Sequence, residues 1–436
     1  MPRPGVRELV GGRRATSVTL VAVYTPPTSR EAAEEADARD PLASFRDRFV
    51  IDDPARIYAD GNSLGRLPVE TRERLLDRLD EWGSRLVGAW PEWIDAPQSV
   101  GDVLAEHVLG AEAAEVVVSD STTVNLYKLC GAAQARRRGA LVTDTANFPT
   151  DRYVLEGLGD LVLFESDPIG GPTPADVTAA CEGREISLVC LSHVAYRSGA
   201  LADIAAITRA VHDRGALVVW DLSHSAGAIP VALADAAVDL AVGCTYKYLN
   251  GGPGSPAFLY VRRELQDELR SPIWGWFGQR DQFAMGPTYD PVSGIARFLA
   301  GTPPMLDLAA VAVGVALVAE AGIDALRAKS VALTELVVQL HDERLAPLGF
   351  ELGSPRDADR RGAHVSLRHP DAWRICRALI ERANVIPDFR RPDSIRLGLP
   401  PLYTRFVDVW DAVDRLVALV ASRTHEGVDA TPARVT

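Results

Sequence analysis

From about residue 110 onward, short apolar runs alternate with longer segments in which apolar residues recur every three or four positions. Short apolar runs bounded by turn residues are typical of buried strands, and the longer period is typical of amphipathic helices. Strands separated by helices in this way predict a mostly parallel sheet covered on both faces. We expect strands at 116–118, 140–143, 161–164, 187–191, 216–220, 240–243 and 257–261, and helices at 122–137, 174–182 and 203–214.

The pattern changes after residue 304, where two long helical segments are separated at Gly322. Beyond residue 346, the elements become shorter, with strands expected at 350–352, 363–367, 384–387 and 395–397 and helices at 371–383 and 404–421. The sequence therefore predicts an α/β fold with a second, smaller α+β domain. The predicted parts are a flexible N-terminal extension with a short helix near its end (1–40), a large domain (41–305) that begins with an arm segment (41–110), connecting helices (306–345), a small C-terminal domain (346–422) and a tail (423–436).

Composition narrows the class of protein. The 436 residues carry a formal net charge of −13, which argues against nucleic acid or an anionic membrane as the main partner. No apolar run approaches the roughly 18 residues of a membrane-spanning helix, and we expect no signal peptide. The five cysteines are scattered and form no C-x-x-C motif, which argues against a zinc ribbon or a disulfide framework and favours a reducing, cytoplasmic location.

Lysine occurs at three positions, so chemistry that needs an amine has three candidates. Lys247 follows an apolar predicted strand and precedes a turn that contains Gly251, Gly252 and Gly254. Burial at such a place disfavours the ammonium form and produces a nucleophilic amine, although a surface lysine is the alternative. The other two, Lys128 and Lys329, lie in helical patterns, and for both we expect a solvated helix face.

Asp221 stands at the carboxyl end of a predicted strand, and His224 follows three residues later. A carboxylate there can cap a helix, bind a metal or pair with a cationic ring nitrogen, and the spacing of other ligands does not favour a metal. An amine, a carboxylate and phosphate donors are what pyridoxal phosphate requires. Thr122 and Thr123, between a strand and a helix, offer such donors, although an ordinary helix cap is the alternative. Phe148 offers a ring for the cofactor face, and a core position is its alternative.

Eight segments from residue 58 to residue 403 together carry a specific family resemblance. They are Tyr58-Ala-Asp-Gly-Asn-Ser-Leu-Gly65, Thr122–Leu126, Phe148–Asp151, Trp220–His224, Cys244-Thr-Tyr-Lys-Tyr-Leu-Asn-Gly-Gly252, Gly275-Trp-Phe-Gly278, Gly301–Pro304 and Arg396-Leu-Gly-Leu-Pro-Pro-Leu-Tyr403. Over about residues 40–422, the chain resembles the kynureninase family. That resemblance implies the fold of the fold-type I pyridoxal phosphate enzymes, with a seven-stranded, mostly parallel sheet in the large domain.

For the cofactor, the resemblance implies a Schiff base with Lys247, a partner for the pyridinium nitrogen in Asp221, and His224 near the ring's phenolic oxygen. Phe148 would stack on the ring. The other cofactor-binding positions that it implies are Thr122, Thr123, Asp151, Ser192, Tyr246, Trp276 and Thr302. Because Trp276 and Thr302 resemble residues that arrive from a second subunit, the resemblance also implies a homodimer with its sites at the interface.

For the substrate, Arg396 matches an arginine that holds the carboxylate, a role that suits the planar guanidinium. Ser63 is expected at the rim of the site, with turn geometry alone as its alternative. Trp90 and Thr302 match positions that differ between family members preferring L-kynurenine and those preferring 3-hydroxykynurenine. An indole with a small hydroxyl resembles the kynurenine-preferring type, while packing beside Trp93 is the alternative for Trp90.

The implied reaction is hydrolytic cleavage of the β,γ carbon–carbon bond of L-kynurenine, or of a 3-hydroxy or other ring-substituted form, to an anthranilate and L-alanine. Lys247 would remove the α-proton, and Tyr246 would transfer protons if nearby cations lower the pKa of its phenol. The resemblance further implies a place in tryptophan catabolism by the kynurenine pathway and in NAD biosynthesis.

Three other functions remain open from the sequence. The first is a biosynthetic relative that acts on a substituted kynurenine in secondary metabolism. The second is a cysteine desulfurase-like or aminotransferase-like enzyme of the same fold; a desulfurase would need a mobile cysteine, whereas Cys376 lies in a predicted helix and Cys244 beside a strand. The third is a cofactor-binding regulatory module, which would need a partner-binding or basic DNA-binding segment.

Overall fold

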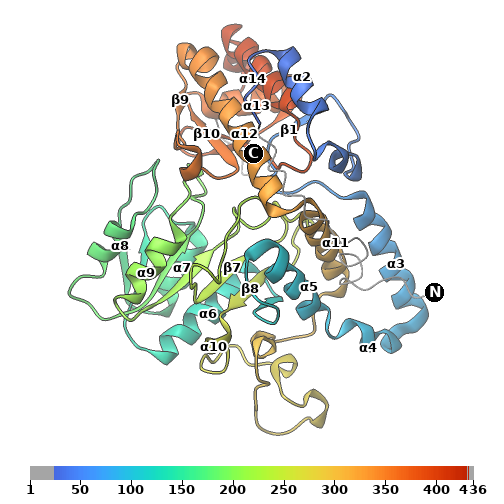
Figure 1. Cartoon of the computed structure of the whole chain (residues 1–436), viewed down its shortest axis with the longest axis vertical. Helices are drawn as coiled ribbons and strands as arrows, with labels where there is room; N and C mark the ends of the chain where they lie inside the picture. Colours follow the sequence, from blue (N-terminus) through green and yellow to red (C-terminus); the bar gives the residue numbers. More distant parts are fainter. Residues whose placement is uncertain (1–23, 430, 432–436) are drawn as a thin grey trace.

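A seven-stranded sheet forms the centre of the larger part of the molecule (Figure 1). The computed structural model describes residues 24–429 and 431, so the expectations for 1–23, 430 and 432–436 lie outside the described residues. The sheet order is β2-β8-β7-β6-β5-β3-β4, and only β8 runs antiparallel to its neighbours, which confirms the mostly parallel sheet. The strands are β2 (Val116–Val118), β3 (Ala140–Asp144), β4 (Leu161–Phe164), β5 (Ile186–Ser192), β6 (Leu217–Asp221), β7 (Leu240–Gly243) and β8 (Phe258–Val261).

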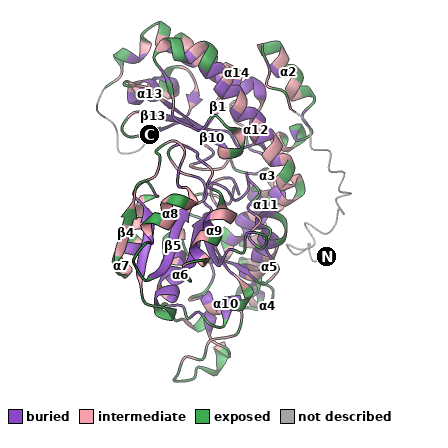
Figure 2. Ribbon diagram, turned by 60° about the vertical axis from the view of Figure 1, so that its left-hand side comes forward, coloured by how far each residue is buried: buried purple, intermediate pink, exposed green. Residues whose placement is uncertain are grey.

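Helices cover both faces of this sheet, because successive side chains of each strand belong to opposite hydrophobic cores. Val116 and Val118 lie in one core and Val117 in the other. Figure 2 shows the buried strands enclosed by helices whose outer surfaces are exposed. One face packs against α6 (Thr122–Arg136) and α7 (Pro149–Leu158); the other packs against α5 (Ala96–Leu104), α8 (Pro174–Ala180), α9 (Ile204–His212) and α11 (Met305–Ala321). The remaining helices of this part are α3 (Val69–Arg85), α4 (Trp90–Trp93) and α10 (Arg263–Gln266).

The two long helices that follow the sheet meet at Gly322, as the sequence predicts. Helix α11 ends there and α12 (Ile323–Leu340) begins, with Gly322 at φ +80°, a conformation that favours glycine. Within residues 24–429, no single helix is long and apolar enough to cross a membrane. Helices α11 and α12, with the turns up to Leu348, pass that test only as a pair bent by 82°.

A second hydrophobic core lies between α12 and the C-terminal elements. Its antiparallel sheet has the order β12-β13-β10-β9, and a separate parallel pair joins β1 to β11. The boundaries predicted for the domains stay predictions. The elements are β1 (Ile57–Tyr58), β9 (Glu351–Leu352), β10 (His364–Arg368), α13 (Ala372–Arg382), β11 (Val385–Ile386), β12 (Asp388–Arg390), β13 (Ser394–Gly398) and α14 (Phe406–Ala421).

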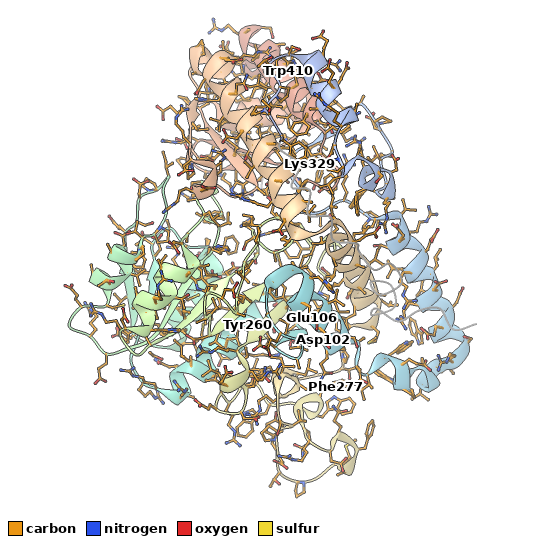
Figure 3. All side chains as sticks on the ribbon, viewed as in Figure 1. Asp102, Glu106, Tyr260, Phe277, Lys329 and Trp410 are labelled. Carbon is orange, nitrogen blue, oxygen red and sulfur yellow. The ribbon has the colours of Figure 1, made fainter. Side chains whose placement is uncertain are left out.

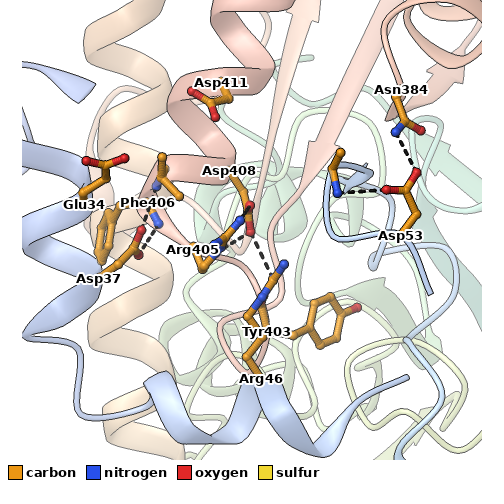
Figure 4. A network of polar contacts seen from close by, with 12 residues as sticks. Glu34, Asp37, Arg46, Asp53, Asn384, Tyr403, Arg405, Phe406, Asp408 and Asp411 are labelled. Atoms are coloured by element: carbon orange, nitrogen blue, oxygen red, sulfur yellow. Dashed lines mark hydrogen bonds and ion pairs between the residues drawn. The ribbon is translucent and has the colours of Figure 1, made fainter. Parts of the chain in front are cut away.

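The described part of the predicted N-terminal extension packs against α14. Its helix α2 (Arg30–Ala38) brings Asp37 to the start of α14, where the carboxylate accepts the N–H groups of Phe406 and Val407 at 2.6 and 3.0 Å. Figure 4 shows this contact beside the ion pair of Arg46 and Asp408. Because the first N–H groups of a helix have no partner within it, Asp37 supplies a cap. Over residues 24–40, the segment is therefore anchored rather than loose.

Lys329 is buried in α12, so the expectation of a solvated face is wrong (Figure 3). Its side chain is 2% exposed, and Nζ lies 2.7 Å from Oδ2 of Asp40. The other oxygen of Asp40 accepts hydrogen bonds from the Tyr24 hydroxyl and the Leu42 N–H. Helical periodicity could not reveal this pair, because the carboxylate comes from a distant segment of the chain.

Lys329→Met is expected to lower the free energy of unfolding by about 3–5 kcal/mol, because it leaves the buried Asp40 without its cation. Chemical denaturation measures the change. Arg280→Met is the matched control, since Arg280 pairs with Asp290 on the exposed surface, and it should change stability little. Equal losses in both variants would contradict a buried, stabilising role for Lys329.

Candidate active site

The carboxyl ends of the parallel strands meet at one edge of the large sheet, where ligands bind in such folds. Ser192 ends β5 and pairs with Asp221, the last residue of β6. A cavity of about 220 Å³ opens at this edge. It is lined by Ser121, Thr122, Thr123, Phe148, Thr150, Asp151, Ser192, Tyr196, Asp221, Ser223, His224, Tyr246, Lys247, Gly254 and Ser255. The structure thus brings together every predicted cofactor position except Trp276 and Thr302.

Lys247 enters the cavity from the loop after β7. Its Nζ lies 3.2 Å from Nε2 of His224 and 5.8 Å from the ring centroid of Tyr246. A turn from the N-terminal segment holds this loop: the Gly65 N–H donates to the Tyr246 carbonyl at 2.8 Å, and a Cβ on Gly65 would lie 2.4 Å from the Lys247 carbonyl oxygen. Only glycine permits this approach, so the Asn-Ser-Leu-Gly segment positions the amine.

His224 is buried beside that amine. Its Nε2 is 3.2 Å from Nζ of Lys247 and 3.2 Å from the Asn62 carbonyl oxygen. Burial, and then the charge of Lys247, hold the pKa of His224 well below its usual value. The imidazole is therefore neutral near pH 7, with one nitrogen as a donor and the other as an acceptor.

Two carboxyl groups face the same cavity. Oδ1 of Asp221 accepts the Ser223 N–H at 2.8 Å, which fixes the carboxylate at the strand end. Asp151 is almost completely buried, and its Oδ2 has no hydrogen-bond partner among the residues that the structure describes. Burial, and then the charge of Asp221, raise the pKa of Asp151 well above its usual value. Two buried carboxyls beside one amine favour a further cationic group, and a protonated pyridine nitrogen fits that requirement.

Phosphate donors fit at the start of α6. Ser121 is the N-cap, and its Oγ accepts the Val124 N–H at 3.3 Å. Thr122 and Thr123 line the cavity with the first N–H groups of the helix, which no helical bond uses. Phe148 also lines the cavity; it is 38% exposed and contacts Tyr196 edge-on at 5.3 Å, so it is not a core residue. The donor set therefore fits pyridoxal phosphate.

Arg396, on β13, contacts the other predicted substrate residue. Its Nη2 is 3.3 Å from Oγ of Ser63, and its Nη1 donates to the carbonyl of Tyr196, a residue of the cavity wall. Asp388 accepts from Nε at 2.7 Å and holds the other edge of the guanidinium. Arg396 is 1% exposed. The nearby Asp60 is itself buried, and its burial, followed by the charge of Asp388, raises the pKa of Asp60 to about 7.

Asp388 is a functional candidate that the sequence reasoning missed. It lies opposite Arg396 in the β12–β13 ladder, so a correct prediction of β12 would have indicated the pair. Tyr196 and Asn62 were also missed, because they act through main-chain carbonyls, which any residue type supplies.

Five predicted site residues do not line the cavity. Arg396 and Ser63 lie next to its wall residue Tyr196 or to each other, whereas Trp90, Trp276 and Thr302 lie elsewhere. Trp90 packs edge-on against Trp93 at 5.8 Å and lies 6.4 Å from the ring of Phe277, which Figure 3 labels low in the large domain. Trp276 is 41% exposed, and Thr302 is exposed as well. Within one chain, the structure does not bring these last three residues to Lys247.

Two comparisons bear on the family. Residues 326–416 match the model of the kynureninase C-terminal domain. The kynureninase of Pseudomonas fluorescens is 43% identical over 406 residues, which cover 91% of this chain and 97% of that protein. The kynureninase of Burkholderia pseudomallei (strain K96243) is 42% identical over 421 residues, which cover 94% and 100% of the two chains. This chain belongs to the kynureninase family.

Solved structures place the kynureninase family fold among the fold-type I enzymes. A cysteine desulfurase from Thermococcus onnurineus NA1 superposes with a TM-score of 0.73 at 19% identity, covering 88% of this chain and 99% of that one. An alanine–glyoxylate aminotransferase from Nostoc sp. has a TM-score of 0.64 at 17% identity, with 85% and 96% covered. At these identities, the likeness shows the fold alone.

The cysteines of this kynureninase family member do not favour the desulfurase alternative. All five are free and buried. Cys376 lies in α13, and burial raises its pKa, as it does for Cys244. A nucleophilic cysteine needs access and a lowered pKa, so neither residue has the required character.

The expected lowering of the Tyr246 pKa is wrong. Interaction with Cys244, followed by burial, raises the pKa of Tyr246 above its usual value. The sequence reasoning assumed cationic neighbours, whereas a thiol and the Asp221 carboxylate dominate the surroundings of this phenol. Tyr246 is therefore a neutral hydrogen-bond donor.

Proposed function

We propose that this chain is a pyridoxal phosphate-dependent hydrolase that cleaves the β,γ carbon–carbon bond of L-kynurenine. One water is consumed, and anthranilate and L-alanine are released. The family membership supports this reaction. The observation that carries it is the lysine amine beside two buried carboxyls at the strand ends, with helix N–H groups across the same cavity.

Bound pyridoxal phosphate supplies an aldehyde for the substrate amine and a protonated ring that withdraws electrons from the bonds being broken. Asp221 keeps that ring nitrogen protonated, and the start of α6 binds the phosphate. Lys247 accepts and returns the α-proton once the substrate occupies the site. Tyr246, as a neutral phenol, donates a proton to the β-carbon that remains in the alanine part, rather than acting as the base.

Purified protein with the cofactor and L-kynurenine tests this function. Anthranilate fluorescence and alanine in equal amounts are expected. Sulfide from cysteine, or an amino-group transfer product, would overturn the proposal in favour of another enzyme of this fold. The kcat/KM values for L-kynurenine, 3-hydroxykynurenine and ring-halogenated kynurenines then decide between the catabolic substrate of tryptophan degradation and a substituted one from secondary metabolism.

We further propose a homodimer whose second subunit brings Trp276 and Thr302 to the site. The support is a set of large apolar side chains that are exposed on α3, the adjoining turn η2 (Leu86–Ala89) and the 274–285 segment. It includes Leu76, Leu79, Trp82, Leu86, Val87, Trp274, Trp276, Phe283 and Met285. Mixing inactive Lys247→Ala and Trp276→Ala subunits should then restore activity, because some mixed sites hold both intact residues; no restoration would contradict shared sites.

The five free cysteines support a cytoplasmic location.

Trp90→His combined with Thr302→Asn is expected to shift the ratio of kcat/KM values toward 3-hydroxykynurenine by about 10-fold, because polar groups then face the added hydroxyl. Steady-state kinetics with both substrates measures the ratio. Trp93→His, on the neighbouring indole, is the matched control and should leave the ratio unchanged. An unchanged ratio in the double variant would assign specificity to other residues.

Arg396→Ala is expected to raise KM by about 10- to 100-fold with a smaller change in kcat, because a charge-assisted contact to the substrate carboxylate is lost. Since removal of Arg396 also leaves Asp388 without this partner, Arg396→Lys is measured beside it; this variant keeps the charge but loses the fork and should give an intermediate KM. Arg390→Ala, an exposed partner of the same Asp388, is the control. A KM unchanged in both Arg396 variants would mean that another group holds the carboxylate.

A further inference from the structure

Lys128 is a buried cation beside the cofactor cavity, contrary to the solvated face that the sequence suggests. It lies in the second turn of α6 and is 0% exposed. Its Nζ lies 2.5 Å from Oδ2 of Asp120 and 2.7 Å from the carbonyl oxygen of Phe298. Burial lowers the pKa of Lys128, while Asp120 opposes that shift. A buried lysine with a carboxylate and a carbonyl as partners is an arrangement that the surrounding structure must hold in place.

Asp120 begins the loop that would receive the phosphate. It directly precedes Ser121, the N-cap of α6, and has the left-handed φ of +48°. Its carbonyl accepts the Ala257 N–H at 2.8 Å, which ties it to the facing loop that contains Ser255. The residues after Asp120, from Ser121 to Thr123, line the cavity. A carboxylate at this position opposes the binding of an anion at the helix N-terminus unless its charge is offset.

We propose that Lys128 is a positioning residue for the cofactor phosphate: it offsets the charge of Asp120 and fixes the 120–123 loop against the Phe298 carbonyl. This inference rests on the proposed function, because it requires pyridoxal phosphate in the cavity. Phe298 ends the turn η6 (Ile295–Phe298), four residues before Thr302. Lys128 therefore joins the phosphate loop to the segment that carries Thr302.

Binding of two cofactor forms to the apoenzyme separates this role from a general structural one. Pyridoxal lacks the phosphate, so it reports on the ring and the amine but not on the phosphate loop. Quenching of tryptophan fluorescence gives a Kd for each form. Lys128→Met is expected to raise the Kd for pyridoxal phosphate by about 10-fold or more and that for pyridoxal by less than about 3-fold. Equal losses for the two forms would overturn the proposal.

The double variant Lys128→Met with Asp120→Asn removes both charges and is expected to restore the ratio of the two Kd values to within about 3-fold of the parent's. Failure of this rescue would also overturn the proposal. If Lys128→Met does not fold, Asp120→Asn alone tests the proposal. It should lower the Kd for pyridoxal phosphate by about 3-fold without changing the Kd for pyridoxal. An unchanged ratio of the two Kd values would contradict the role of Lys128. Lys329→Met, the other buried lysine with a carboxylate partner, is the control and should not alter the ratio.

These measurements are independent of the substrate. A protein that binds the cofactor as expected but does not hydrolyse L-kynurenine would refute the proposed function and leave the role of Lys128 standing. Normal hydrolysis with no difference between the two cofactor forms would refute the role of Lys128 alone.

Discussion

Lys247→Ala is expected to abolish turnover of L-kynurenine, with kcat reduced by at least about 10⁴-fold, because in the proposed mechanism one side chain supplies both the attachment of the cofactor and the proton transfer. The chain has three lysines, all in its described part, and the other two are engaged elsewhere: Lys128 with Asp120 and Phe298, and Lys329 with Asp40. No second lysine amine lines the cavity among the described residues. Steady-state assay of anthranilate release measures the loss.

A second readout locates the covalent link directly. Borohydride reduction fixes the cofactor to its lysine, and mass spectrometry of the digested protein should then find it on the peptide that contains Lys247. Lys247→Arg keeps the positive charge without a nucleophilic amine and should be equally inactive and unlabelled. Lys329→Met should remain labelled. A labelled peptide in Lys247→Ala would refute the assignment.

The sequence predicted the large sheet well, because its signals are local. Each strand is a run of apolar residues, such as Val116–Val118 and Leu240–Gly243, and the structure has both strands with those bounds. Whether the shorter segments form strands depends on their pairing with other strands. Strand β12 (Asp388–Arg390) contains two charged residues and was missed, since its pairing with β13 stabilises it rather than its own composition.

The cavity could be predicted for a topological reason: parallel strands bring their carboxyl ends to one edge, so Ser192, Asp221 and Lys247 converge although they are distant in sequence. Contacts between remote segments could not be predicted. Periodicity places Lys128 and Lys329 on helices but does not show that Asp120 and Asp40 lie within reach. A single sequence also does not tell whether Trp276 and Thr302 serve the site of their own chain.

Asp221→Asn is expected to lower kcat by about 10²- to 10³-fold while leaving the fold intact. The amide oxygen can still accept the Ser223 N–H, which the carboxylate now holds at 2.8 Å, so the strand end keeps its geometry. What is lost is the negative charge that keeps the ring nitrogen protonated, and with it most of the electron withdrawal on which the bond cleavage depends. The proposed substrate contacts are those of Arg396 and Ser63 instead, so KM should change much less than kcat.

The neighbouring carboxyl provides the control that makes this result specific. Asp151 faces the same cavity, and burial, followed by the charge of Asp221, raises its pKa, so Asp151→Asn keeps the shape of the side chain and should remove less negative charge than Asp221→Asn. We expect it to lower kcat by less than about 10-fold. If both substitutions had the same effect, the two carboxyls would share the task and Asp221 would not be the single partner of the ring nitrogen. If Asp151→Asn had the larger effect, the ionised group would be Asp151, and the strand-end carboxylate would serve to shape the loop through Ser223.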